Sequence, residues 1–396
     1  MWFSWSRKDA AVRVGAIVDV GDSKIEVALV YSDKSKPDPE VIWTHAEVLP
    51  PQGSTDSMNV LKKGIFNAFS ALSKDGVRIL NERKLPTEIS LIQVTLHAPY
   101  SHTITRSVSV KARRPVKVTR SLVEELEQKA NTEAYKMQSS ELSRFGITLY
   151  PLSSAAVALR LNGYPTKYPY KSMAEEITLS QHVSFSTFDF RSMLVEARDK
   201  YLPKAYLDAD SFISLFYRTV MTMSAKTSDC SLLTIGDSAT EFITVRDGLP
   251  QHSFFMPFGL NHISAKIGST TGLLPHEARA VTKDNRVDNT ALADIQQKAV
   301  LDAAVTDFEA ELKKLLSKSG DVLALPQTIY LQNECDHEAF FTPMVLRIAN
   351  SVTGIKHSVH SITSEFFSCK GVRDASLLSL AYAFHKKLYE DDYLDL

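Results

Sequence analysis

The stretch VGAIVDVGDSKIEVALV (residues 14–30) decides the fold of this chain. Two apolar, β-branched runs flank a short polar segment at Gly21-Asp22-Ser23, which is the pattern of a strand, a tight turn and a second strand. A third strand-like run, EVIWTHAEVLP (residues 40–50), follows after a proline-containing turn. The sequence therefore predicts a three-stranded antiparallel meander that opens a sheet.

A second meander of the same layout is predicted from SLLTIGDSATEFITVRDGLPQHSFFMPFG (residues 231–259). Its glycine turn, TIGDS (residues 234–238), has the same form as DVGDS (residues 19–23). Either turn alone could belong to any hairpin, but two of them in matching settings indicate an internal duplication.

Between the meanders, residues 101–205 read as strands, a helix, further strands and a closing helix, which predicts a small inserted α+β unit. Helical patterns follow the second meander, and an amphipathic helix is predicted over residues 373–389. The predicted domains are a first lobe core at 1–100 completed by 371–396, the inserted subdomain at 101–205, and a second lobe at 206–370 with a helical subdomain near 259–318.

Composition narrows the class of protein. The 45 Lys and Arg residues balance 46 Asp and Glu residues to a net charge of −1, which argues against nucleic acid as a main partner. The sequence has neither an apolar run of membrane-spanning length nor the apolar core of a signal peptide. Three widely spaced cysteines fit a reducing, cytoplasmic setting: Cys230, Cys335 and Cys369.

Both glycine turns resemble the phosphate motifs of bacterial actin-like ATPases. The first turn resembles the motif Asp-(Ile/Val)-Gly-(Ser/Thr)-(Ser/Thr)-Lys of the cell-division protein FtsA, with matches at Asp19, Gly21, Ser23 and Lys24. The second turn resembles the second phosphate motif of FtsA and of the pilus-assembly protein PilM. The matches there are Gly236, Thr240, the turn Arg246–Gly248, Pro257, Gly259 and Ile263. The resemblance covers about residues 12 to 390.

This resemblance implies an α/β, actin-like (ribonuclease H-like) fold, with duplicated lobes around a cleft and a small α+β subdomain inserted in the first lobe. In the family the two turns face each other across the cleft and hold the phosphates of ATP, with Mg²⁺ at the first aspartate. The implied metal ligand is therefore Asp19. The implied nucleotide-binding residues are Asp19, Gly21, Asp22, Ser23, Lys24, Gly236, Asp237, Ser238, Thr240 and Gly259.

Three departures from the family motifs weaken the case for an ATPase. Thr234 stands where the family has a second aspartate near the metal. Asp22 and Asp237 bring negative charge to the turns, where a carboxylate about 5 Å from a phosphate opposes it by roughly 3 kcal/mol; alternatively, both cap their own turns and point away. The segment ECD (residues 334–336) lacks the glycine pair of the adenosine motif. We expect weak binding of ATP and Mg²⁺ at best, and assign no catalytic residue.

The N-terminus combines aromatic and basic residues that could form a short interfacial membrane anchor. These residues are Trp2, Phe3, Trp5, Arg7 and Lys8. The alternative is that the aromatic rings pack on the first lobe. The acidic C-terminal residues 389–396 lack the amphipathic anchor helix of FtsA, so any membrane affinity is expected at the N-terminus.

A dense basic stretch, KARRPVK (residues 111–117), lies between a strand-like run and a helix. Two interpretations stay open, an exposed solvated loop and a site for an anionic partner.

The resulting hypothesis is an actin-like scaffold or adaptor of bacterial cell division. It would be cytoplasmic or peripheral at the inner face of the cell membrane, would recruit other protein subunits, and would self-associate head to tail. The alternatives are a PilM-like adaptor of pilus assembly or secretion, and a genuine Mg²⁺-dependent ATPase.

Overall fold

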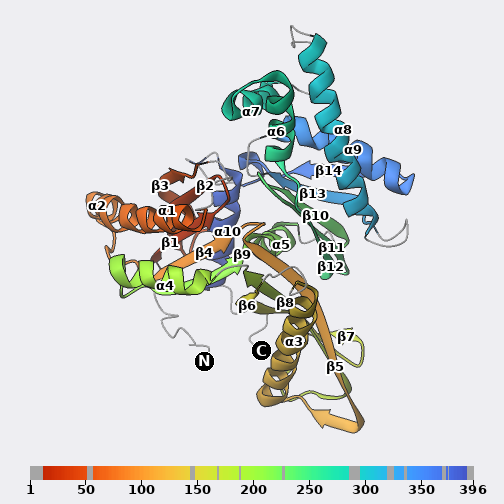
Figure 1. Ribbon diagram of the computed structural model, residues 1–396. Helices are drawn as coiled ribbons and strands as arrows, with labels where there is room; N and C mark the ends of the chain where they lie inside the picture. The colour runs from red at the N-terminus through yellow and green to blue at the C-terminus, as the bar shows by residue number, and fades with distance from the viewer. Residues whose placement is uncertain are drawn as a thin grey trace.

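The computed structural model describes residues 12–50, 57–142, 148–166, 169–186, 189–224, 228–284, 295–318, 325–333, 337–367, 372 and 374–389. Within these residues the chain forms three β-sheets with helices packed around them (Figure 1). The five candidate membrane-anchor residues, the segment 334–336 and the acidic C-terminal end lie outside the described residues. No described helix is both long and apolar enough to cross a membrane.

The first sheet consists of β1 (Val12–Val20), β2 (Lys24–Asp33), β3 (Glu40–Val48), β4 (Leu91–Leu96) and β9 (Tyr206–Ser211). Its strand order is β3-β2-β1-β4-β9. The predicted meander forms the antiparallel part, whereas β4 runs parallel to β1 and β9 runs parallel to β4. Because helices cover both faces of this sheet, β1 is apolar on both sides.

The second sheet repeats this topology strand for strand. It consists of β10 (Cys230–Ile235), β11 (Thr240–Arg246), β12 (Leu249–Met256), β13 (Thr328–Asn333) and β14 (Ser358–Ser361). The order is β12-β11-β10-β13-β14, again with a meander followed by two parallel strands. The predicted duplication of an α/β unit is therefore confirmed.

Helices cover the outer face of each sheet. The first sheet carries α1 (Ser57–Ala71), the π-helical turn η1 (Leu72–Gly76), α2 (Val77–Glu82) and α4 (Phe190–Tyr201). The second sheet carries α6 (Leu260–Thr271), α7 (Pro275–Asp284), α8 (Ile295–Ser317) and α9 (Glu338–Thr353).

The two sheets share one hydrophobic core, which is built around a pair of equivalent helices. α5 (Phe212–Met223) follows β9, and α10 (Ala375–Tyr389) follows β14 after the short 3-10 helix η4 (Ser364–Phe366). Both helices pack with inward side chains of the two sheets, such as Ile17 and Leu232. Each helix thus completes its own half and contacts the other, which fixes the two halves together.

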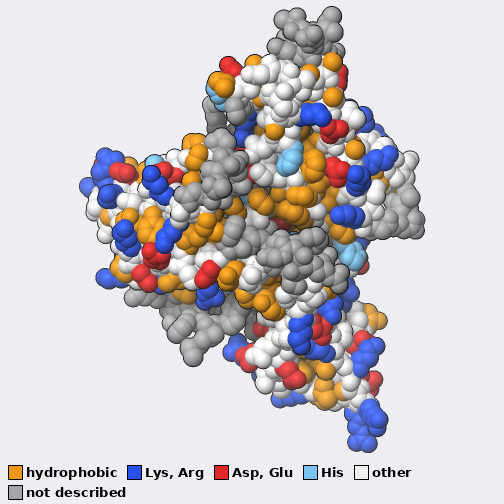
Figure 2. Space-filling model, viewed as in Figure 1, with side chains coloured by type: hydrophobic (Ala, Val, Ile, Leu, Met, Phe, Trp, Pro, Cys, Tyr) orange, Lys and Arg blue, Asp and Glu red, His pale blue; other side chains and the backbone are white. Residues whose placement is uncertain are grey.

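A third sheet forms the inserted unit, which projects away from the two-sheet body (Figures 1 and 2). It consists of β5 (Ser101–Lys117), β6 (Tyr150–Leu161), β7 (Tyr164–Pro165) and β8 (Met173–Ser186), in the order β5-β8-β6-β7. The long helix α3 (Arg120–Leu142) packs on one face. At its base, buried hydroxyls join this sheet to the end of β9, with Thr103 Oγ1 2.5 Å from Ser211 Oγ.

Two strands, β9 and β14, do not follow from the sequence pattern. Asp210 and Ser211 end β9, and α5 begins directly after them at Phe212. Both strands occupy the same position, the edge beyond the parallel pair, and each pairs with one neighbour in its sheet. A short edge strand needs no apolar alternation of its own, so YLDADS and SVHS carry little strand signal.

We predict that Gly15 and Phe384 are coupled in stability. A Cβ atom on Gly15 would lie 2.1 Å from Cζ of the buried Phe384 ring. Gly15→Ala alone should therefore lower the free energy of unfolding by about 1–3 kcal/mol, as overpacked cores do. Combined with Phe384→Leu, which removes the clashing atom, it should cost clearly less than the sum of the two single changes. Urea denaturation of the four proteins measures this.

The control is Gly76→Ala, where the nearest atom to the new Cβ would lie 3.2 Å away and the backbone is helical. It should change stability less than Gly15→Ala. Strict additivity in the Gly15 and Phe384 cycle would contradict the packing described for α10.

Candidate functional site

The first glycine turn joins the end of β1 to the start of β2. The N–H of Gly21 donates to the carbonyl of Lys24 at 3.0 Å and closes the hairpin, while the N–H of His97 donates to the carbonyl of Val20 at 3.0 Å. The turn is therefore attached to the segment that follows β4. Asp22, at the tip of the turn, is 3% exposed.

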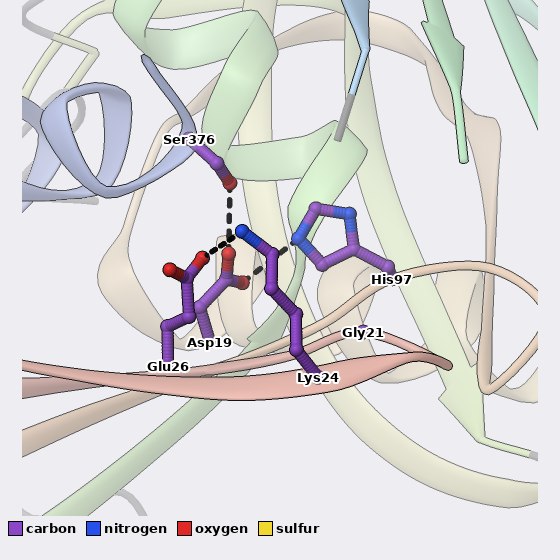
Figure 3. Close-up of a pocket in the computed structure, with 6 residues that line it drawn as sticks. All are labelled: Asp19, Gly21, Lys24, Glu26, His97 and Ser376. Carbon is purple, nitrogen blue, oxygen red and sulfur yellow. Dashed lines mark hydrogen bonds and ion pairs between the residues drawn. The ribbon is translucent and has the colours of Figure 1, made fainter. Parts of the chain in front are cut away.

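Asp19 is buried and both of its carboxylate oxygens are engaged by other side chains. His97 Nε2 lies 2.8 Å from Oδ1, and the hydroxyl of Ser376 donates to Oδ2 at 2.8 Å (Figure 3). The His97 ring is itself fixed by stacking on Phe212, with 4.0 Å between the ring centroids. Asp19, the candidate metal ligand, is thus bonded by one residue that directly follows β4 and by one residue in the first turn of α10.

Lys24 lies between two carboxylates. Its Nζ is 2.6 Å from Glu26 and 3.0 Å from Asp374, the residue before α10. Burial alone would lower the pKa of Lys24, but the charges of Asp374 and Glu26 outweigh burial and raise that pKa.

Glu26 and Asp374 interact with the same cation, Lys24, but their pKa values shift in opposite directions. Burial, assisted by the charge of Asp374, raises the pKa of Glu26 to about 7 even though Lys24 acts to lower it. Burial also acts against ionisation of Asp374, but Lys24 and the N–H of Leu377 keep the pKa of Asp374 below its ordinary value. Asp374 is therefore the permanent counter-ion of Lys24.

Little space remains beside Asp19 and Lys24. The cavity between these side chains has a volume of about 10 Å³ and is lined by Asp19, Gly21, Lys24, Glu26, His97 and Ser376 (Figure 3). That is about the space of one water molecule.

The second glycine turn repeats the backbone geometry of the first. The N–H of Gly236 donates to the carbonyl of Ala239 at 2.8 Å, the counterpart of the Gly21 bond. Thr234 occupies the position equivalent to Asp19, since each lies opposite a glutamate on the next strand, Glu241 and Glu26 respectively.

The second turn also packs directly against the start of α6. The carbonyls of Gly236 and Asp237 accept the first N–H groups of the helix, from Leu260 at 3.1 Å and Asn261 at 2.7 Å. A Cβ on Gly259 would lie 2.3 Å from the Gly236 carbonyl oxygen, so only glycine permits this approach. Helix N–H groups that could bind an anion are thus already bonded within the protein.

The remaining predicted residues of the second turn also have internal partners. The Asp237 carboxylate is 1% exposed and forms an ion pair with Arg279 of α7. Asn261 Nδ2 lies 3.4 Å from Ser238 Oγ, and the hydroxyl of Thr240 donates to the carbonyl of Phe258 at 2.7 Å.

The structure thus brings the predicted residues together in two groups. Asp19, Gly21, Asp22, Ser23 and Lys24 lie on the first turn and its strands, and Gly236, Asp237, Ser238, Thr240 and Gly259 lie on and beside the second. The side chains that bond them, namely His97, Arg279, Asp374 and Ser376, do not follow from the motifs. A local signal existed for Asp374 alone, because an aspartate ahead of an apolar helical run is a helix cap, and it accepts the N–H of Leu377 at 3.0 Å.

These residues, as arranged, do not fit Mg²⁺ and ATP. Each Asp19 oxygen already accepts a hydrogen bond, the cavity beside it is no larger than a water molecule, and Lys24 is shared by two carboxylates. Among the described residues, no group of three or more acidic, histidine or cysteine side chains could hold a metal ion.

Comparison with solved structures identifies the fold. No protein-family model and no curated sequence matches the chain. The protein in a PilM-PilN type IV pilus biogenesis complex is similar over 95% of this chain and 98% of its own, with a TM-score of 0.56 and 12% identity. Weaker similarity extends to the ethanolamine utilization protein EutJ from Carboxydothermus hydrogenoformans (TM-score 0.48, 12% identity, 95% and 90% coverage) and to a glycerol dehydratase reactivase (0.49, 9%, 94% and 100%).

The similarity to the PilM complex confirms the predicted actin-like fold, because it spans nearly the whole of both chains. At 12% identity it shows the fold alone. The site described above therefore rests on this chain's own side chains.

We predict that Glu26→Gln stabilises the protein in a pH-dependent way. The folded pKa of Glu26, about 7, exceeds the unfolded value near 4.3, so the folded state retains this proton and wild-type stability falls as pH rises between these values. Glutamine does not titrate, so the stability of the variant does not fall in this way as the pH rises. The variant should therefore gain about 1–3 kcal/mol relative to wild type between about pH 5 and pH 8.

Urea denaturation of both proteins at about pH 5 and at about pH 8 measures this change in the free energy of unfolding. The control is Glu40→Gln, which alters an exposed glutamate paired with Arg83 and should show no such change with pH. A gain for Glu26→Gln that is equal at both pH values would contradict the charge arrangement around Lys24.

Proposed function

We propose that this protein is an actin-fold scaffold that recruits other proteins without turning over ATP. The observation that carries the proposal is the engagement of the first glycine turn by the chain itself, at Asp19 by His97 and Ser376 and at Lys24 by Glu26 and Asp374. The groups that would bind phosphate and metal are instead used to hold α10 against the first sheet.

Electrostatics support the same reading. A phosphate in this position would approach Asp19, Asp374 and, when ionised, Glu26, with Lys24 as the cation among them. Each carboxylate at about 5 Å opposes a phosphate charge by roughly 3 kcal/mol at an effective dielectric near 20. A nucleotide would have to overcome this repulsion and also separate Lys24 from its partners.

An assembly role fits a fold that keeps both halves while the chain's own side chains bond the first glycine turn. The similar PilM structure belongs to a complex with PilN, so a protein partner is the type of ligand that this comparison supports. Two assembly roles remain candidates: pilus biogenesis, favoured by that structure, and cell division, favoured by the FtsA-like turn at Asp19 to Lys24. Attachment at the inner face of the cell membrane, through the N-terminal aromatic residues, belongs to the same proposal.

A Mg²⁺-dependent ATPase is the competing function, because Asp19 and Lys24 match the phosphate motif. We predict that the purified protein releases phosphate from ATP at the background rate, with and without Mg²⁺. Asp19→Ala, and the isosteric Asp19→Asn, should leave that rate unchanged. Turnover that requires Mg²⁺ and disappears in both variants would establish the enzyme and reject the scaffold proposal.

We further predict that partner binding needs no nucleotide. The tagged chain should retain one set of candidates, either tubulin-like division proteins or membrane proteins of pilus assembly, equally in Mg²⁺-ATP and in buffer with a chelator. Retention only in Mg²⁺-ATP would contradict the proposal, since it would show that the cleft opens to a nucleotide and controls assembly.

A further inference from the structure

The far end of the inserted sheet contains a large bulge in β5. Lys111 pairs with Glu176 and Val116 pairs with Ala174, so residues 112–115 stand opposite the single residue Glu175. The extra residues leave the ladder, as in other bulges. Arg113 and Arg114, at the centre of the bulge, are exposed.

Positive charge is concentrated at this end. The stretch KARRPVKVTR (residues 111–120) contains no acidic residue, and its Lys and Arg side chains are exposed. Lys171, in the loop that bonds to Val118, is exposed beside it. Glu176 neutralises Lys111 at 3.0 Å, and Glu175 is the other acidic residue of β8 at this level. Blue Lys and Arg side chains gather at the lowest point of the space-filling view (Figure 2).

Two of the most exposed large apolar side chains of the described residues lie at the same end. Tyr164 is 77% exposed and Met173 is 57% exposed. The register places Met173 opposite Lys117, and it places Tyr164 level with Val110 in the outer part of the sheet, on the β7 edge across from β5. Apolar and aromatic side chains set among basic ones form the combination that lies stably at a lipid headgroup layer.

The shape of this end favours a partner with a flat surface. The sheet and α3 project from the body and end in a narrow tip (Figure 1). A projecting tip can rest on a flat surface, whereas a peptide or a duplex is normally held in a groove or along an extended face. The chain as a whole also lacks the basic excess of a nucleic-acid-binding protein.

We propose that this tip docks on an anionic membrane surface. Arg113, Arg114 and Lys117 contact lipid phosphates, and Tyr164 and Met173 enter the headgroup region. The contact requires neither the cleft nor the N-terminal anchor, so it stands whether or not the scaffold proposal holds. It would orient the body with the cleft at a distance from the membrane.

The test is co-sedimentation of the full chain with vesicles of phosphatidylglycerol and phosphatidylcholine, and with vesicles of phosphatidylcholine alone. To isolate the tip, the measurement is repeated with Trp2, Phe3 and Trp5 changed to alanine. We expect binding to the anionic vesicles only, weakening with added salt. Arg113→Glu with Arg114→Glu should reduce that binding by about tenfold or more, and Tyr164→Ala should reduce it less.

The matched control is Lys34→Glu with Lys36→Glu, an equal charge reversal on the exposed turn between β2 and β3, which should leave binding unchanged. Circular dichroism checks that each variant is folded, and Arg113→Gln with Arg114→Gln provides a milder change at the same positions. Equal losses from the control and the tip variants would overturn the proposal. So would preferential binding to a DNA duplex or to polyglutamate that the vesicles do not displace.

Discussion

The contact between the start of α10 and the first glycine turn is the constraint on which the rest of the structure depends. Lys24 and Asp374 are separated by 350 positions in the chain, and Asp19 and Ser376 by 357, yet both pairs are in direct hydrogen-bond contact. Through them α10 is fixed on the first sheet, and because α10 also packs with α5 and the second sheet, the two halves acquire one core. The same contact engages Asp19 and Lys24, two residues that the motif predicts for nucleotide binding.

A buried charge cluster of this kind contributes more to geometry than to net stability. Removing charged groups from water is costly, and their mutual attraction only partly offsets that cost unless every group is well bonded. Here Asp374 has both Lys24 and a helix N–H, whereas burial and the charge of Asp374 raise the pKa of Glu26 to about 7. In the second half, Arg279 is the counter-ion of the buried Asp237. Gly259 lets the start of α6 approach the second turn closely enough to bond it. Both turns keep the same backbone hydrogen bond at their glycine, and Asp19, Lys24 and Asp237 are each bonded to side chains of the chain itself.

The sequence was sufficient for the parts of this fold that have local signals. Both meanders, the two glycine turns, the inserted unit and the last helix follow from strand alternation, turn residues and helical periodicity. The edge strands β9 and β14 were missed because their formation depends on β4 and β13, which offer the pairing edge. The partners of Asp19 and Lys24 were missed for a related reason, since only the folded chain brings residues 97, 374 and 376 to residue 19. From Thr234, Asp22 and Asp237 the sequence predicted weak binding of ATP and Mg²⁺, which stays a prediction, but it did not predict the side chains that bond Asp19 and Lys24.

The central claim is that the chain's own side chains occupy the nucleotide site. Isothermal titration of Mg²⁺-ATP into the full chain tests it most directly, with Mg²⁺ alone and buffer as blanks. We predict no saturable heat of binding up to millimolar nucleotide, because entry would break the Lys24–Asp374 and Asp19–Ser376 contacts. Saturable binding with a dissociation constant of about 1 μM, equivalent to roughly −8 kcal/mol, would contradict the claim. It would mean that α10 and the first turn separate readily in solution.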